Sequence, residues 1–206
     1  MDIQPITLIG RHVRLEPLSV NHAPALWGVG NDPDIWRYLP YGAIDSPVKM
    51  QGWVEEMLRR QSQGTDLVFA IVHRASGQTV GATRYLMIEP HNRSLEIGGS
   101  WLGKAFRRTV ANTESKYLLL QHAFETLDCV RVQFRTDLRN GRSQKAIERL
   151  GAVREAVFRK YTLMPDGHQR TSVFYSILDD EWPQVKARLE RLIEERRQTA
   201  LRDDGR

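Results

Sequence analysis

Hydrophobic and polar side chains alternate along seven stretches of the chain, and this period of two is the pattern of strands with one buried face. The stretches lie at residues 11–17, 67–73, 79–87, 95–101, 130–136, 153–158 and 172–177. Two connections contain turn residues, Ser-Gly-Gln at 76–78 and Pro-Asp-Gly at 165–167, which suit tight links between neighbouring strands. The pattern therefore predicts a sheet of about seven strands.

Other stretches repeat apolar residues every three or four positions, which is helical spacing. Four or five helices are predicted: one after Ser19, one from Ser46 to about Gly64, one that carries Tyr117 and ends near Leu127, one over residues 140–150, and one from Asp179. Gly151 directly follows the fourth of them, where glycine commonly ends a helix. The aromatic segment at 35–41 lies between turn residues and is assigned to neither a helix nor a strand.

The middle of the chain has the order strand, helix, strand, from 95–101 to 130–136, which predicts a right-handed parallel unit. The earlier strands form an antiparallel meander, and no repeat or long linker divides the chain. One α+β domain with a mixed sheet is therefore the economical prediction. Its core is expected over about residues 8–180, followed by a C-terminal helix and polar tail over residues 181–206.

Composition narrows the compartment and the chemistry. The 206 residues are 41% hydrophobic and 27% charged, as in soluble globular proteins, and no apolar run approaches the length of a transmembrane helix. The N-terminus lacks the pattern of a secretory signal. Cys129 is the only cysteine, which excludes an internal disulfide and a cysteine-based zinc site, so a reducing cytoplasm is expected. The spacing of the histidines indicates no metal site.

The net charge of +5 suits an anionic cofactor or an acidic substrate as well as it suits nucleic acid. In the last helix, arginine and lysine alternate with glutamate, which is typical of a solvated, ion-paired helix face. A clean basic face with interleaved aromatic residues is missing, so nucleic-acid binding is not expected.

Residues 100–114 join a predicted strand to the start of the long central helix. They contain three cations and then three residues able to cap a helix: Lys104, Arg107, Arg108, Thr109, Asn112 and Thr113. The start of a helix has unpaired backbone N–H groups and the positive end of the helix dipole. Cations just before it make this place suitable for a phosphate or pyrophosphate.

Three blocks of residues, in this order, resemble the GCN5-related N-acetyltransferase (GNAT) superfamily, and more closely its RimJ/RimL-type branch. The first runs from Trp-Leu-Gly at 101–103 through Arg-Arg-Thr-Val-Ala-Asn-Thr-Glu at 107–114. The second includes Asn-Gly-Arg-Ser at 140–143 and Glu-Arg-Leu-Gly-Ala at 148–152, and the third runs from Asp-Gly-His at 166–168 to Glu-Trp-Pro at 181–183. The resemblance covers nearly the whole chain. It implies a three-layer fold with a mostly antiparallel sheet and a splayed parallel pair in its middle.

The resemblance also implies an acetyl-CoA-dependent N-acetyltransferase, with the cofactor between the ends of strands 95–101 and 130–136. The residues that would hold acetyl-CoA are Trp101, Leu102, Arg107, Arg108, Thr109, Val110, Ala111, Asn112, Asn140 and Ser143. The family loop is usually rich in glycine, yet Arg108 and Val110 occupy places where glycine is common. The arginines are expected to replace some backbone contacts with charge-assisted hydrogen bonds. Glu114 should point away from the phosphates, because it would repel them.

Acetyl transfer to an amine needs a group that removes a proton, a donor for the oxyanion and a donor for the leaving thiolate. Glu96 is the first candidate base, although a strand glutamate is more often exposed or ion-paired. Ser143 is a candidate donor to the thiolate, and the alternative is an ordinary helix-surface serine. Many relatives have a tyrosine acid near the place of Ile147, which has no proton to donate. Cys129 is a poor nucleophile candidate because it precedes a buried-looking strand.

In this fold the early helices cover the acceptor site. Trp36, Tyr38, Tyr41 and Tyr161 are the candidates for contact with the substrate, and core packing is the alternative. The acceptor could be a protein N-terminus or a small-molecule amine, and the sequence does not choose between them. A homodimer is compatible with the resemblance. The alternative function is a non-catalytic acyl-CoA-binding or regulatory module, favoured by Ile147 and the missing loop glycines.

Overall fold

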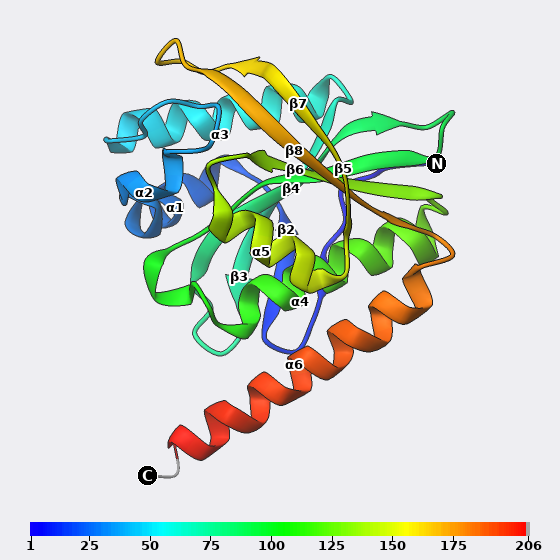
Figure 1. Cartoon of the computed structure of the whole chain (residues 1–206). Helices are drawn as coiled ribbons and strands as arrows, with labels where there is room; N and C mark the ends of the chain where they lie inside the picture. Colours follow the sequence, from blue (N-terminus) through cyan, green and yellow to red (C-terminus); the bar gives the residue numbers. More distant parts are fainter. Residues whose placement is uncertain (205–206) are drawn as a thin grey trace.

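A computed structural model describes the backbone of residues 1–204 and the side chains of residues 1–195. A mixed sheet runs through the middle of the molecule, with helices on both of its faces (Figure 1). Its eight strands, counted over the described residues, are β1 (Leu8–Ile9), β2 (Val13–Pro17), β3 (Asp66–His73), β4 (Thr79–Glu89), β5 (Ser94–Leu102), β6 (Arg131–Asp137), β7 (Val153–Leu163) and β8 (Gln169–Leu178). The two-residue strand β1 is the one that the alternation did not predict.

The strands lie in the order β1-β2-β3-β4-β5-β6-β8-β7, and every neighbouring pair except β5–β6 is antiparallel. The predicted mixed sheet with one parallel pair at its centre is therefore confirmed. The parallel ladder is short, because it joins Ser94 to Arg131 and ends at the pair Glu96–Gln133. Beyond that pair both strands continue, β5 to Leu102 and β6 to Asp137, without bonding each other.

The helices form two groups. One group comprises α1 (Ala23–Gly30), α2 (Pro33–Trp36) and α3 (Pro47–Ser62), and the other comprises α4 (Val110–Gln121), α5 (Gly141–Leu150) and α6 (Trp182–Asp204). Each group encloses its own hydrophobic cluster against one face of the sheet. Trp53 and Met57 belong to the cluster under α1–α3, whereas Leu119 and Leu150 belong to the one under α4–α6. The predicted three layers are confirmed.

Two helices differ from the prediction. Residues 33–36 form the short helix α2, because Asp32 accepts the N–H of Asp34 and Pro33 occupies the first turn, where its missing N–H is tolerated. The central helix keeps α-helical bonding to Gln121 and continues as a π-helical turn over His122–Thr126. None of the helices in the described part of the chain is both long and apolar enough to cross a membrane.

Glu114 fastens the central helix to the beginning of the sheet. It is 3% exposed, and its carboxylate accepts the backbone N–H groups of Arg11, His12 and Val13 at 2.8, 2.7 and 2.7 Å. The side chain therefore turns toward the β1–β2 connection rather than toward the loop before α4, as expected. Gly10 packs so closely that a Cβ atom there would lie 2.7 Å from Cδ of Glu114.

Gly81 allows β4 and β5 to approach beside the end of β5. A Cβ atom on Gly81 would lie 2.1 Å from the backbone oxygen of Trp101, so Gly81→Ala must displace one strand. We expect this substitution to lower the free energy of unfolding by about 1–3 kcal/mol, measured by urea denaturation. Gly52→Ala is the control, because the exposed Gly52 in α3 has nothing within 4 Å of such an atom. That change should stabilise the protein by about 0.5–1 kcal/mol, and equal effects at both glycines would contradict the close approach.

Candidate active site

The gap between β5 and β6 is the central feature of the candidate site. After the pair Glu96–Gln133 the facing edges of the two strands have no partner in the sheet, because β5 bonds only β4 and β6 bonds only β8 there. Backbone N–H and C=O groups on such edges are available to an extended ligand. Of the candidate residues, Trp101 and Leu102 lie on the β5 side of this gap, and Asn140 and Ser143 follow the end of β6.

A β-bulge shapes the β5 side of the gap. Ala82 pairs with Trp101 and Arg84 pairs with Gly98, so Thr83 alone faces both Gly99 and Ser100. Gly99 has a φ of +58°, in the left-handed region that glycine adopts without strain. The bulge therefore changes the direction of β5 just beyond the last bond to β6.

Lys116 contacts this bulge from the face of the sheet that α4 covers. It extends from α4, is 7% exposed, and donates to the hydroxyls of Thr83 at 3.2 Å and of Ser100 at a shorter distance. Those two hydroxyls also bond each other at 2.7 Å. Burial lowers the pKa of Lys116 from 10.5 to about 7. Sequence reasoning missed this residue, since a lysine within a helix is usually solvated.

Lys116 should make stability depend on pH between 7 and 9. Its pKa is lower in the folded protein than in the unfolded chain, so over this range the unfolded chain binds more protons and stability rises with pH. The expected rise is about 2 kcal/mol from pH 7 to pH 9, as the difference between the wild-type protein and Lys116→Met in denaturant titrations. A difference that stays constant over this range would contradict the depressed pKa.

The loop between β5 and α4 has an arginine in a backbone conformation that is typical of glycine. Arg108 has a φ of +64°, the left-handed conformation that glycine would take with less strain. Thr109 caps α4 by accepting the N–H of Ala111 at 3.2 Å, and Val110 begins the helix. Ala111 and Asn112 follow in its first turn. The other N–H groups of that first turn have no partner within the helix, which makes them available to an anion.

Arg107 is engaged elsewhere in the molecule. Its guanidinium bonds Asp32 at 2.8 Å and the carbonyl of Leu102 at 3.1 Å. Asp32 caps α2, and its pKa is lowered first by the N–H of Asp34 and then by Arg107. Arg107 therefore ties the loop between β5 and α4 to α2, so the predicted phosphate contact would require this ion pair to rearrange.

The start of α5 brings Asn140 and Ser143 together, but partly for a structural reason. Asn140 is the N-terminal cap, and its side-chain oxygen accepts the backbone N–H of Ser143 at 3.1 Å. The half-buried Ser143 lies in the first turn of α5. Ile147 is 8% exposed and belongs to the core cluster under α4–α6. The position of the family's tyrosine acid is thus filled by core packing.

Glu96 lies at the point where the two strands part. It is buried, one carboxylate oxygen accepts from Gln133 at 2.9 Å, and the other lies 3.4 Å from the guanidinium of Arg135. It is therefore ion-paired as well as placed beside the gap. A carboxylate has about four acceptor positions, so these two contacts leave room for a water or an amine.

Of the four aromatic residues predicted to contact the substrate, Trp36, Tyr38 and Tyr41 differ from one another in burial and in their neighbours. Trp36 is buried in the core under α1–α3, where its ring lies 5.2 Å from that of Trp101 and its indole N–H bonds the carbonyl of Gly30. Tyr41 packs 5.9 Å from Trp53, and burial raises its pKa. Tyr38 is half-buried between the guanidinium groups of Arg37 and Arg139. Trp36 is thus mainly a packing residue.

The fourth, Tyr161, lies on the far side of the gap. It is exposed on β7, and the guanidinium of Arg135 lies 5.0 Å from its ring centroid. A pocket of about 300 Å³ opens between the α1–α2 region and the tip of the β7–β8 hairpin. It is lined by Trp27, Asn31, Pro33, Trp36, Arg37, Leu39, Gly42, Ala43, Ile44, Asp45, Met164, Pro165 and Asp166.

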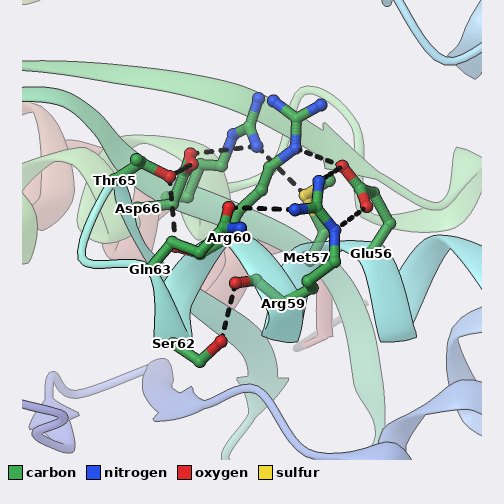
Figure 2. A network of polar contacts seen from close by, with 9 residues as sticks. Glu56, Met57, Arg59, Arg60, Ser62, Gln63, Thr65 and Asp66 are labelled. Carbon is green, nitrogen blue, oxygen red and sulfur yellow. Dashed lines mark hydrogen bonds and ion pairs between the residues drawn. The ribbon is translucent and has the colours of Figure 1, made fainter.

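The buried ion pair of Arg84 and Asp66 was also missed by sequence reasoning. Its atoms lie 3.0 Å apart, and Asp66 begins β3. Figure 2 shows that Asp66 also accepts from Thr65, beside the end of α3. The same view shows the exposed pairs of Glu56 with Arg59 and Arg60 (Figure 2). Alternation along β4 is enough to predict that Arg84 lies on the face under α3. The sequence does not show that Asp66 is the carboxylate with which it pairs.

Two other buried groups lie outside the gap. Cys129 is buried against Met1, and burial raises its pKa to about 11, which confirms it as a poor nucleophile. His122 is buried and stacks on Tyr85 beneath the sheet, with a pKa lowered by burial. His122 therefore packs α4 against the sheet.

Comparisons with known proteins agree with this geometry. Residues 12–153 match the family model described as an acetyltransferase (GNAT) domain. A structure from T. thermophilus, named as an acetyltransferase, is 43% identical, with a TM-score of 0.84, covering 92% of this chain and 98% of that one. A GCN5-related N-acetyltransferase from Brucella melitensis is 28% identical, with a TM-score of 0.86, covering 93% and 86%.

A curated relative, named uncharacterized N-acetyltransferase p20, of Bacillus licheniformis, is 21% identical over 160 residues, 75% of this chain and 86% of that protein. This chain belongs to the GNAT acetyltransferase family, and it is an N-acetyltransferase. The fold is also that of RimL, named as a ribosomal L7/L12 alpha-N-protein acetyltransferase, at a TM-score of 0.74 and 18% identity.

Proposed function

We propose that the whole chain is one N-acetyltransferase domain that moves the acetyl group of acetyl-CoA directly to an amine. The parting of β5 and β6 after Glu96 and Gln133 carries this proposal, because it leaves two strand edges for one extended ligand. The residues around the gap fit acetyl-CoA: the edges suit the amides of its pantetheine arm, and the start of α4 suits its pyrophosphate. When bound, acetyl-CoA supplies an activated thioester.

The chain's own residues then have separable tasks. The backbone of β5 near Trp101 and Leu102 would orient the pantetheine, and an N–H group near Leu102 would bind the acyl oxygen. With acetyl-CoA bound, Ser143 would donate a hydrogen bond to the sulfur, and Asn140 holds the turn that presents Ser143. Glu96 accepts a proton from the attacking amine, directly or through one water. Ile147 has no proton to donate, so the hydroxyl of Ser143 would be the group that stabilises the sulfur of the leaving CoA.

The acceptor side is formed by the pocket near Trp36 together with Tyr38, Tyr41 and Tyr161. The acceptor of the proposed reaction is a protein N-terminus or a small-molecule amine. Aromatic rings at such a mouth favour a cationic amine by stacking and by cation–π attraction.

Acetyl-CoA binding and thiol release test the proposal. Calorimetry should detect acetyl-CoA binding, and a thiol reagent should detect free CoA when amines from a broad panel are added. The double variant Arg107→Ala/Arg108→Ala should bind acetyl-CoA about tenfold more weakly in low salt, with a smaller loss in high salt. Binding without thiol release for any amine would favour the non-catalytic acyl-CoA-binding module, and absence of binding would exclude both functions.

A further inference from the structure

Around the gap, the sheet face under α1–α3 and the turn after β6 bring together four guanidinium groups and three carboxylates. Register and alternation place the even-numbered residues of β8 and the odd-numbered residues of β6 on this face, because Arg135 is paired with Phe174 and Asp137 with Ser172. The charged residues around the site on this face are Arg84, Arg135, Arg139, Arg170, Asp66, Glu96 and Asp137.

Each of the three carboxylates is already committed to one arginine. Asp66 pairs with Arg84 at 3.0 Å, Glu96 with Arg135 at 3.4 Å, and Asp137 with Arg139 at 2.9 Å. Among the described residues, no carboxylate oxygen lies within 4.0 Å of the guanidinium of Arg170, the fourth cation.

Arg170 is nevertheless buried. Its exposed fraction is 6%, its Nε–H has no hydrogen-bond partner among the described residues, and one terminal N–H donates to the carbonyl of Tyr38 at 3.3 Å. The hydroxyl of Ser172, two residues along the same face, is also buried without a partner. Two side chains on the same face of β8 therefore each have an unpartnered buried polar atom, and one of them contacts the segment that contains Tyr38.

A buried guanidinium cannot lose its proton, so it must be compensated by an anion or by hydrogen bonds. Burial lowers the pKa of Arg170 first, and the nearby guanidinium of Arg135 lowers it further. Asp137 and Glu96 act in the opposite direction, and Arg139 adds a further lowering effect. The protein alone leaves this site with one positive charge in excess.

We propose that Arg170 is a recognition residue that binds an anionic group, a carboxylate or a phosphate, carried by the amine to be acetylated. The inference rests on the proposed function, because the acceptor must lie on this face. Its amine would approach Glu96 while its anionic group approaches Arg170, so both charges of one substrate meet an opposite charge. Such a charge-assisted pair is stronger than a neutral hydrogen bond and suits an arginine fork.

Matched acceptors test this directly. The pairs are γ-aminobutyrate and its amide, the peptide amides Ser-Asp-Ala and Ser-Asn-Ala, and O-phosphoethanolamine and ethanolamine, each assayed by thiol release from acetyl-CoA. In the wild-type protein kcat/KM should be about 10–100-fold higher for the anionic member of at least one pair, mostly through KM. The preferred pair identifies the carboxylate or the phosphate.

Arg170→Met should remove that preference and leave kcat/KM for the neutral members unchanged, whereas Arg170→Lys should restore part of it. Arg159→Met, which removes an exposed arginine of β7, is the control and should preserve the preference. If the wild-type protein acetylated the neutral and anionic members of every pair with equal kcat/KM, the inference about Arg170 would be wrong. The proposed acetyl transfer would still stand.

Two further measurements need no turnover. In ligand-free protein Arg170→Met should raise Tm by roughly 2–8 °C, because it removes a buried charge that has no partner. Glutarate, an unreactive dicarboxylate, should raise Tm of the wild-type protein in the presence of CoA but not that of Arg170→Met. A lowered Tm for Arg170→Met would show that Arg170 has only a structural role. If no amine is acetylated, the absence of any glutarate effect on the Tm of the wild-type protein would lead to the same conclusion.

Discussion

Glu114→Ala is expected to lower the free energy of unfolding by about 3–5 kcal/mol. The carboxylate is buried and accepts three backbone N–H groups, from Arg11, His12 and Val13. Alanine would leave these donors without an acceptor and open space beside Gly10. Urea denaturation followed by circular dichroism measures the loss.

Two variants calibrate that result. Glu114→Gln keeps the shape and one acceptor oxygen but turns an NH₂ group toward the N–H donors, so an intermediate loss is expected. Glu55→Ala removes an exposed glutamate of α3 and should change stability by no more than about 0.5 kcal/mol. If Glu114→Ala were no more destabilising than Glu55→Ala, Glu114 would not fasten α4 to the sheet.

Glu96→Gln should lower kcat by a factor of about 100–10,000, with the acceptor that gives the fastest thiol release. The substitution preserves shape and the contact with Gln133, but an amide cannot accept a proton from the attacking amine. Acetyl-CoA affinity, measured by calorimetry, should stay within about twofold of the wild-type value, because Glu96 lies on the acceptor side of the sheet.

Glu155→Gln is the matched control for this change. Glu155 is a glutamate of β7 that pairs with Arg131, as Glu96 pairs with Arg135, but it lies two strands away from the gap. Glu155→Gln should therefore leave kcat nearly unchanged. Glu96→Gln protein that is folded, binds acetyl-CoA and keeps a kcat within about threefold of wild type would exclude Glu96 as the base.

The fold was largely predictable because its signals are local. Alternation found seven of the eight strands, and it missed β1 because two residues are too few to show a period. The cap and proline of α2 were visible at Asp32 and Pro33, yet four residues give no helical repeat. Gly151, at a φ of +109°, ends α5 where the sequence placed its end.

The site was less predictable because it depends on contacts between distant segments. The resemblance located the loop before α4, but not that Arg107 is bound to Asp32, 75 residues earlier. Helical periodicity says nothing about the sheet residues above Lys116, so its contact with the bulge at Ser100 could not be expected. The unpaired state of Arg170 emerges only when every nearby carboxylate has been assigned to another arginine.

The contacts of Glu114 also bear on how the chain reaches its folded state. They join residues 101 to 103 positions apart, so they form only after about one hundred residues have been brought into one loop. Closing such a loop costs about 4 kcal/mol in chain entropy, and contacts of this separation slow folding. During synthesis, the N–H groups of residues 11–13 have no carboxylate to bind until α4 has left the ribosome. The β1–β2 connection therefore gains its attachment to α4 only after β2 can already pair with β3.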